Sequence, residues 1–207
     1  MSQLTSGMRR TLGLANVYDL FQDQVGARRF RKMYVASYVR PKPGLKILDI
    51  GCGTGAILPY LPKATDYVGF DLSSEYIQSA KKRYGDKGEW HCAPVSEMSV
   101  DDLGTFDIVM ANGVLHHLDD PDAMRLAEVA SKALKPKGRF CSYDGCFTAS
   151  QSKIARYIIS KDRGLNVREP EGYVSLVRSY FSSVELSIRH DMLRIPYTHA
   201  IIVATNG

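Results

Sequence analysis

The chain has 207 residues, enough for one substantial hydrophobic core, and 44% of them are hydrophobic while 24% are charged. This composition excludes an intrinsically disordered chain, and no apolar run approaches the roughly 18 residues that a membrane span needs. The formal net charge of +5 raises the question of a nucleic-acid partner. Because the basic residues are spread along the chain apart from short clusters, the charge favours a solvated surface with mild attraction for anions.

From about residue 45 onward, apolar runs alternate with segments of helical period, which is the pattern of a parallel sheet covered by helices. Three helices are expected between the strands, at about 55–61, 74–84 and 122–134. The predicted strands are Lys46–Ile50, Tyr67–Asp71, Glu89–Ala93, Phe106–Ala111 and Gly138–Asp144.

After residue 145 the rhythm changes. Helices are predicted at 151–160 and 171–180, followed by strands Val184–Ile188 and Ala200–Ala204. The connection around Pro196 is too short for a parallel crossover, so these two strands should pair antiparallel.

These elements predict an α/β fold with a doubly wound, Rossmann-like sheet of seven strands. The sheet should be mostly parallel, with an antiparallel last strand and helices on both faces. No internal repeat or linker divides the chain, so a single domain over 1–207 is expected. Residues 1–40 would form a helical N-terminal cover, and 145–172 an insertion on the substrate side.

A glycine-rich loop carries the strongest functional signal. It reads Asp49-Ile50-Gly51-Cys52-Gly53-Thr54-Gly55, directly after a predicted strand. Its glycines permit a tight turn and let a ligand approach the backbone. Asp71 ends the next strand, about 20 positions later, where an acid can accept hydrogen bonds from ribose hydroxyls.

The spacing of this loop separates two nucleotide-binding classes. A dinucleotide site normally shows G-x-G-x-x-G, because a pyrophosphate must sit against the helix N-terminus. This chain has G-x-G-x-G instead, led by Asp49. Such a loop suits a ligand that lacks phosphate and carries a positively charged amino group, and it disfavours a nicotinamide oxidoreductase.

The region 45–145 resembles the class I S-adenosylmethionine-dependent methyltransferases, particularly their small-molecule (methyltransferase type 11-like) branch. The resemblance rests on 47–55, 68–72, 106–112, Leu115-His116-His117-Leu118 and 134–138. It implies S-adenosylmethionine as cofactor and S-adenosylhomocysteine as product. It also implies that Asp71 holds the ribose and that Leu72 packs on adenine. The other cofactor-binding residues that it implies are Asp49, Gly51, Cys52, Gly53, Gly55, Val95, Ser96, Ala111 and Asn112.

One position departs from the family pattern. Relatives often place an acid after the third strand to bind the adenine amino group, and here Pro94 stands about there. Either Ser96 or the backbone of Val95 binds the adenine amino group instead, or the affinity for the cofactor is weaker.

The chemistry is expected at His116, which follows the fourth strand at its carboxyl edge. In some O-methyltransferases that this segment resembles, the first histidine of such a pair is a base oriented by an aspartate at the end of the fifth strand. Carried onto this chain, the resemblance gives His116 with Asp144. The alternative is that the histidines only flank a helix and that Asp144 caps a strand. A metal site built from His116, His117, Asp119 and Asp120 is the weaker reading, because those carboxylates suit a helix cap before Pro121; no metal is predicted.

The substrate wall is expected to come from the N-terminal cover and the insertion. The arginines Arg156, Arg163 and Arg168 would grip a carboxylate or phosphate, or else lie solvated, with Arg163 paired to Asp162 or Glu169. The candidates are Tyr18, Phe21, His117, Tyr143, Phe147 and Arg156.

The leading function is methyl transfer to a small molecule, with a hydroxyl oxygen favoured and an anionic acceptor as one option. A non-catalytic, cofactor-binding or partner-activating protein is the second hypothesis. An RNA methyltransferase is the third, disfavoured because no basic or aromatic nucleic-acid module is appended. The absence of a signal-peptide pattern and of metal or disulfide spacing among the four cysteines predicts a cytoplasmic protein with no membrane partner.

Overall fold

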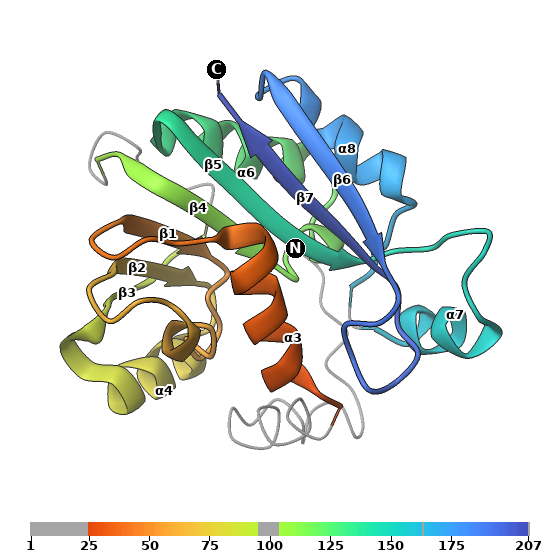
Figure 1. Cartoon of the computed structure of the whole chain (residues 1–207), viewed down its shortest axis with the longest axis horizontal. Helices are drawn as coiled ribbons and strands as arrows, with labels where there is room; N and C mark the ends of the chain where they lie inside the picture. Colours follow the sequence, from red (N-terminus) through yellow and green to blue (C-terminus); the bar gives the residue numbers. More distant parts are fainter. Residues whose placement is uncertain (1–24, 95–103, 163, 207) are drawn as a thin grey trace.

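A computed structural model describes residues 25–94, 104–162 and 164–206. Its strands form one sheet in the order β3-β2-β1-β4-β5-β7-β6 (Figure 1). β7 is antiparallel to both of its neighbours, and the other pairs are parallel. The predicted fold class is therefore confirmed. The strands are β1 (Lys46–Ile50), β2 (Asp66–Asp71), β3 (Glu89–Cys92), β4 (Phe106–Asn112), β5 (Leu134–Gly145), β6 (Ser183–Arg189) and β7 (His199–Thr205).

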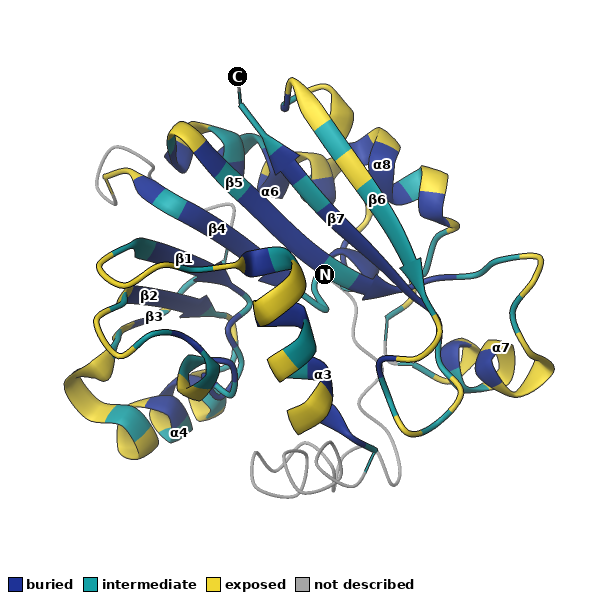
Figure 2. Cartoon of the chain, in the orientation of Figure 1, coloured by how far each residue is buried: buried dark blue, intermediate teal, exposed yellow. Residues whose placement is uncertain are grey.

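Helices cover both faces of the sheet (Figure 1). On one face α3 and α4 pack against β-strand residues such as Ile47 and Ile108, and on the other α6 and α8 pack against residues such as Leu48 and Val109. Because both faces are covered, the central strands are continuous apolar runs and are buried along most of their length (Figure 2). The helices are α3 (Ala27–Tyr34), continued by a π-helical turn at Val35–Val39, α4 (Ser74–Tyr84), α6 (Asp120–Ala133), α7 (Lys153–Ser160) and α8 (Pro170–Arg178).

Local sequence explains where α4 and α6 begin. The Ser73 hydroxyl accepts a hydrogen bond from Tyr76 N at 3.3 Å, and the Asp119 carboxylate accepts one from Asp122 N at 3.0 Å. Each cap satisfies a backbone N–H that has no partner inside its helix. Asp119 is thus a helix cap, as its position before Pro121 indicates.

The helix predicted at 55–61 is wrong. The structure has only a short 3₁₀ turn, η2 (Leu58–Tyr60), in this stretch. Pro62 supplies no N–H to continue a helix, and it disfavours helical backbone at the preceding residue. Accordingly Leu61 is extended, with φ −84° and ψ 157°.

The topology gathers several chain segments at one edge of the sheet. The parallel strands β1, β2, β4 and β5 end there, and because β7 runs the opposite way, it begins there, with His199 paired to Gly145. The expected helical cover is present at 27–34, whereas residues 1–24 lie outside the described part. None of the described helices is long and apolar enough to cross a membrane.

Candidate active site

Asp71, at the end of β2, is anchored by the backbone of the two loops beside it. Gly53 N and Ser73 N each donate to one of its carboxylate oxygens at 2.8 Å. Burial raises the pKa of Asp71, although these N–H groups oppose the rise. Each oxygen keeps a second lone pair, so the carboxylate can still accept from a ligand hydroxyl. The adjacent Leu72 is 47% exposed and offers an apolar surface.

Asp49, at the end of β1, is a buried carboxylate that is only half satisfied. Tyr67 OH donates to its Oδ2 at 2.7 Å, while Oδ1 has no hydrogen-bond partner among the described residues. Burial raises the pKa of Asp49 to about 7. A buried carboxylate with an unsatisfied oxygen is costly, and a ligand cation would offset that cost.

The glycine loop leaves space at its middle position. Gly53 has φ +56°, and a Cβ placed there would meet no atom within 4 Å. Gly55 differs, because a Cβ on it would lie 2.5 Å from the Trp90 ring, so this glycine serves packing within the protein. At the end of β4, both amide atoms of Asn112 are buried without a hydrogen-bond partner in the described ranges. The neighbouring positions of the predicted set, Gly51, Cys52 and Ala111, lie at the same edge.

These features fit the cofactor that the loop pattern implies. With such a cofactor bound, Asp49 would face the amino group, Asp71 would accept from ribose hydroxyls, and Gly53 leaves room at the backbone. Val95 and Ser96, the two residues expected near adenine, lie outside the described residues.

At the other half of the same edge, the structure brings His116 and Asp144 together. His116 lies on the 3₁₀ turn η5 (Leu115–His117) after β4, and Asp144 is at the end of β5. The Nδ1 atom of His116 lies 2.7 Å from Asp144 Oδ1, which also accepts from His116 N at 3.1 Å. Both side chains are buried. With Nδ1 protonated toward Asp144, the ring presents Nε2 to the site.

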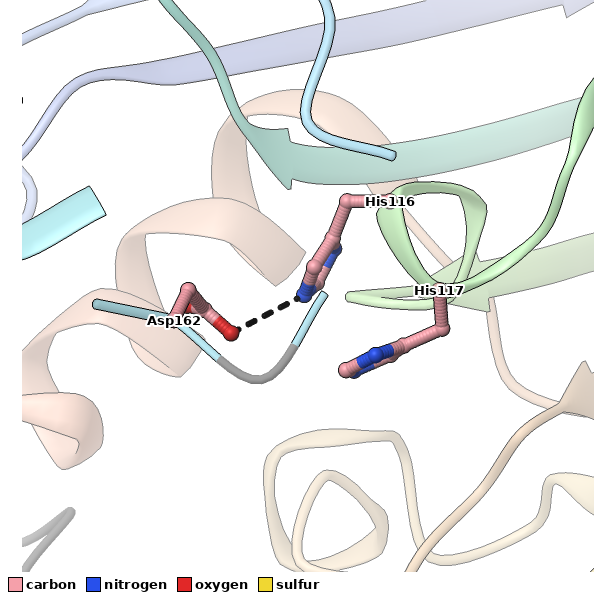
Figure 3. Close-up of side chains that lie close together, drawn as sticks. All are labelled: His116, His117 and Asp162. Atoms are coloured by element: carbon pink, nitrogen blue, oxygen red, sulfur yellow. Dashed lines mark ion pairs between the residues drawn. The ribbon is translucent and has the colours of Figure 1, made fainter. Parts of the chain in front are cut away.

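Asp162, which the sequence analysis did not assign to the site, faces that second nitrogen. Its Oδ1 lies 3.4 Å from His116 Nε2, and Figure 3 shows the carboxylate pointing at the ring edge. Tyr197 OH donates to Asp162 Oδ2 at 3.0 Å. Asp162 follows α7, and Tyr197 precedes β7, so neither is near His116 in sequence. No spacing rule connects them.

The two carboxylates control the protonation of His116. Burial lowers the pKa of its imidazole, but Asp144 and Asp162 more than offset this and raise the pKa to about 9. Burial raises the pKa of Asp162, while His116 and Tyr197 lower it to well below the usual range of a carboxyl. In this arrangement His116 is an imidazolium at neutral pH.

The segment after Asp162 is fixed over His116 by backbone and guanidinium contacts. Asn166 N donates to His116 O at 3.0 Å. Arg168 donates to Leu115 O at 2.8 Å and to Leu118 O at 2.9 Å, and it pairs with Asp120 at 2.6 Å. The guanidinium donors of Arg168 therefore hold this segment against the turn at Leu115–His117 and the start of α6.

The other residues predicted for the substrate wall are divided between the site and its surroundings. The His117 ring lies beside His116, with centroids 4.1 Å apart. Tyr143 packs against Phe30, with centroids 4.5 Å apart. Phe147 and Arg156 stack on each other at 5.0 Å and line an outer hollow of about 480 Å³ on α7. Tyr18 and Phe21 lie outside the described residues.

A metal ion could be considered at His116, His117 and Asp162, because their ligand atoms lie within 4.8 Å of one another. The metal site considered from the sequence had Asp119 and Asp120 in place of Asp162. In the structure Asp119 caps α6, and Asp120 pairs with Arg168. Attraction between the His116 imidazolium and Asp162 accounts for the closeness of these two residues without an ion.

Comparison with known proteins finds similarity to methyltransferases. Residues 48–142 match the family model described as a methyltransferase domain. The Rossmann-like sheet and the glycine loop after β1 are consistent with this match.

Named relatives include methyltransferases with different acceptor atoms. The chain is 30% identical over 99 residues to the ubiquinone biosynthesis O-methyltransferase of Bordetella avium, covering 46% of this chain and 40% of the relative. It is 31% identical over 162 residues to phosphoethanolamine N-methyltransferase 1 of Zea mays, covering 72% of this chain and 30% of the relative. The chain thus spans less than half the length of these curated relatives.

The solved structure of human N-acetylserotonin methyltransferase in complex with S-adenosylmethionine has the same fold. It superposes with a TM-score of 0.69 at 16% identity, covering 95% of this chain and 55% of that one.

Proposed function

We propose that this protein transfers a methyl group from S-adenosylmethionine to a hydroxyl oxygen of a small molecule, with His116 as general base and Asp144 as the residue that orients it. The observation that carries the proposal is the 2.7 Å contact between His116 Nδ1 and Asp144. This pair lies at the same sheet edge as the glycine loop and Asp71. A histidine and a cofactor site so placed can act on one bound acceptor.

The cofactor half of the site positions its ligand through charge and hydrogen bonds. Asp49 would face the amino group, Asp71 would accept from the ribose, and Leu72 would cover adenine. When bound, the cofactor supplies an electrophilic methyl group, so that transfer breaks its S–C bond, forms an O–C bond and yields S-adenosylhomocysteine. The proton of the acceptor hydroxyl then needs a base.

His116 supplies that base at Nε2. Asp144 accepts from Nδ1–H, which fixes the tautomer in which neutral imidazole exposes the Nε2 lone pair. Proton transfer to Nε2 creates an imidazolium between two carboxylates, where Asp144 and Asp162 stabilise it. In the free protein Nε2 carries a proton, because Asp144 and Asp162 raise the pKa of His116 to about 9. This proton must be released to solvent when the acceptor binds, and the neutral ring then accepts the proton of the hydroxyl.

The charges around Nε2 favour an uncharged acceptor group. Asp144 and Asp162 repel an anion at the reacting centre, and Arg168 is committed to backbone carbonyls and Asp120. Arg156 lies on the outer side of α7. An acidic group of the acceptor, if present, would therefore have to lie away from His116.

The proposal is tested by incubating the protein with ¹³C-methyl S-adenosylmethionine and a panel of hydroxylated small molecules, and by detecting methyl ethers by NMR. The expected result is an ether whose formation requires His116 and is lost in His116→Asn. Transfer to nitrogen only, or an unchanged rate in His116→Asn, would contradict the proposal.

A further inference from the structure

The contact between His116 and Asp162 is looser than that between His116 and Asp144. The Nε2 to Oδ1 distance is 3.4 Å, whereas the Nδ1 to Asp144 distance is 2.7 Å. Charge-assisted N–H···O contacts are typically roughly 2.7–2.9 Å long. The Asp144 contact thus has the length of a charge-assisted hydrogen bond, whereas the Asp162 contact is about half an ångström longer than such a bond.

Asp162 is held in place by groups other than His116. Tyr197 OH donates to Oδ2 at 3.0 Å, and Gly164 N donates to Oδ1 at 3.3 Å. Asp162 N is bonded to Ile159 O at the end of α7. The carboxylate therefore keeps its position when it is separated from the imidazole.

The close packing of Gly164 on His116 restricts how this segment can move. A Cβ on Gly164 would lie 2.1 Å from His116 Cδ2. The imidazole side chain is 8% exposed, while that of Asp162 is 27% exposed. Of the two side chains, that of Asp162 is therefore the more accessible to a ligand from solvent.

We infer that His116 Nε2 and the Asp162 carboxylate together bind two neighbouring hydroxyl groups of a vicinal diol. One hydroxyl donates to Nε2 of the neutral ring, once the Nε2 proton has been released, and is methylated, and its neighbour donates to Asp162. Oxygens on adjacent carbons lie about as far apart as two hydrogen-bonded oxygens, so both can reach acceptors that stand 3.4 Å apart. This inference rests on the proposed function and specifies its acceptor as a polyhydroxylated ring, either aromatic or saturated.

The charged and titratable groups around Nε2 fit a diol better than a cation or an anion. A second cation would be repelled by the imidazolium that forms during transfer, and an anion would be repelled by the carboxylates. A neutral diol supplies donors to both acceptors and no net charge. The groups that face His116 are Asp144 from β5, Asp162 after α7, His117 on η5, Arg168 before α8, Tyr197 before β7 and His199 at its start.

The inference is tested by measuring the affinity of matched probes for the complex with S-adenosylhomocysteine, in which no turnover occurs. The pairs are catechol with phenol, and cis-1,2-cyclohexanediol with cyclohexanol. The unmodified protein should bind at least one diol about tenfold or more tightly than its mono-ol, the effect of one hydrogen bond to a charged acceptor. Which diol is preferred distinguishes an aromatic from a saturated acceptor.

Asp162→Ala should reduce the preference for the diol to within about twofold, and Tyr197→Phe, which leaves Asp162 less firmly held, should reduce it partly. The exposed Asp86→Ala is the matched control and should keep the full preference. If Asp162→Ala fails to fold, Asp162→Asn together with Tyr197→Phe takes its place. Equal affinity for diol and mono-ol in the parent, retention of the preference in the Asp162 variant, or tighter binding of cyclohexylamine than of the diol would overturn the inference.

A second readout separates this role from a structural one. In an NMR titration of the His116 ring, the parent should titrate near its raised pKa of about 9, and Asp162→Asn should titrate at a lower pH because one carboxylate is lost. An unshifted titration would contradict the assigned contact. Failure of the proposed function would look different: S-adenosylhomocysteine would not bind, or methyl transfer would not depend on His116.

Discussion

The two halves of the candidate site are built in different ways. In the cofactor half, Asp71 is held by the backbone N–H groups of Gly53 and Ser73, which lie within 18 residues of it in the chain. In the acceptor half, His116 contacts Asp144 and Asp162, which lie 28 and 46 residues further along the chain, and Asp162 is held by Tyr197. Local loop geometry thus determines the first half, and packing between distant segments determines the second. We therefore expect the two halves to fail independently when they are mutated.

The largest expected effect is that of His116→Asn, which should lower turnover without changing affinity for the cofactor product. Loss of a general base should lower turnover by about 10²- to 10⁴-fold. Affinity for S-adenosylhomocysteine should stay within about twofold, because the hydrogen bonds and ion pairs of His116 with described residues go to Asp144, Asp162 and Asn166 rather than to Asp49 or Asp71. Parallel measurement of rate and calorimetric affinity checks this. His91→Gln, which removes a partly exposed histidine paired with Glu89, is the control that should leave both quantities unchanged.

Asp71→Ala should produce the opposite pattern. Removal of the carboxylate leaves ribose hydroxyls without acceptors and also releases Gly53 N and Ser73 N. Affinity for S-adenosylhomocysteine should fall by about 1–3 kcal/mol. Calorimetry on the variant gives the value, and an affinity equal to that of the parent would remove Asp71 from the site.

Arg168→Ala should affect the acceptor half through the fold. It leaves Leu115 O and Leu118 O without their guanidinium donors, and the free energy of unfolding should fall by about 1–3 kcal/mol. Urea unfolding measures this change. Cofactor affinity should stay as in the parent, and a large loss of it would show that the two halves are coupled.

The smallest expected effect is a pH dependence that belongs to the cofactor half. Asp49 has its pKa raised to about 7 by burial, so its carboxylate takes up a proton as the pH falls below 7. Affinity for a cofactor with a charged amino group should therefore decrease between pH 7 and pH 5.5, by at most about tenfold per pH unit. In Asp49→Asn the affinity should be lower and independent of pH over this range.

In the free protein the same group acts on stability with the opposite sign. The folded-state pKa of Asp49 lies above its ordinary value of 3.8, so its contribution to stability is fully present at low pH and is lost as the pH rises through about 7. Thermal unfolding without ligand should show this, and the dependence should weaken in Asp49→Asn.

The sequence predicted the fold well, because the strands and the glycine loop depend on local patterns, and the structure brings the loop and Asp71 into contact. The strands are continuous apolar runs, the glycine loop follows β1 directly, and Asp71 stands at a fixed spacing from it. The short link between the last two strands predicted their antiparallel pairing. The helix at 55–61 was mispredicted because the apolar residues there outweighed the effect of Pro62 on Leu61.

The acceptor half could be predicted only in part. His116 and Asp144 follow adjacent strands, so the sheet order places them together, and their contact could be anticipated by resemblance. Asp162 lies in a polar stretch after a helix, where a charged residue usually faces solvent. Only the folded segment, fixed by Arg168, brings Asp162 to His116. The roles of these residues remain predictions.

Calorimetric titration of the protein with S-adenosylhomocysteine, S-adenosylmethionine and NAD measures the cofactor preference of the site. We expect the first two to bind at Asp49 and Asp71, and NAD not to bind. Binding of NAD, or binding of none of the three, would contradict this expectation.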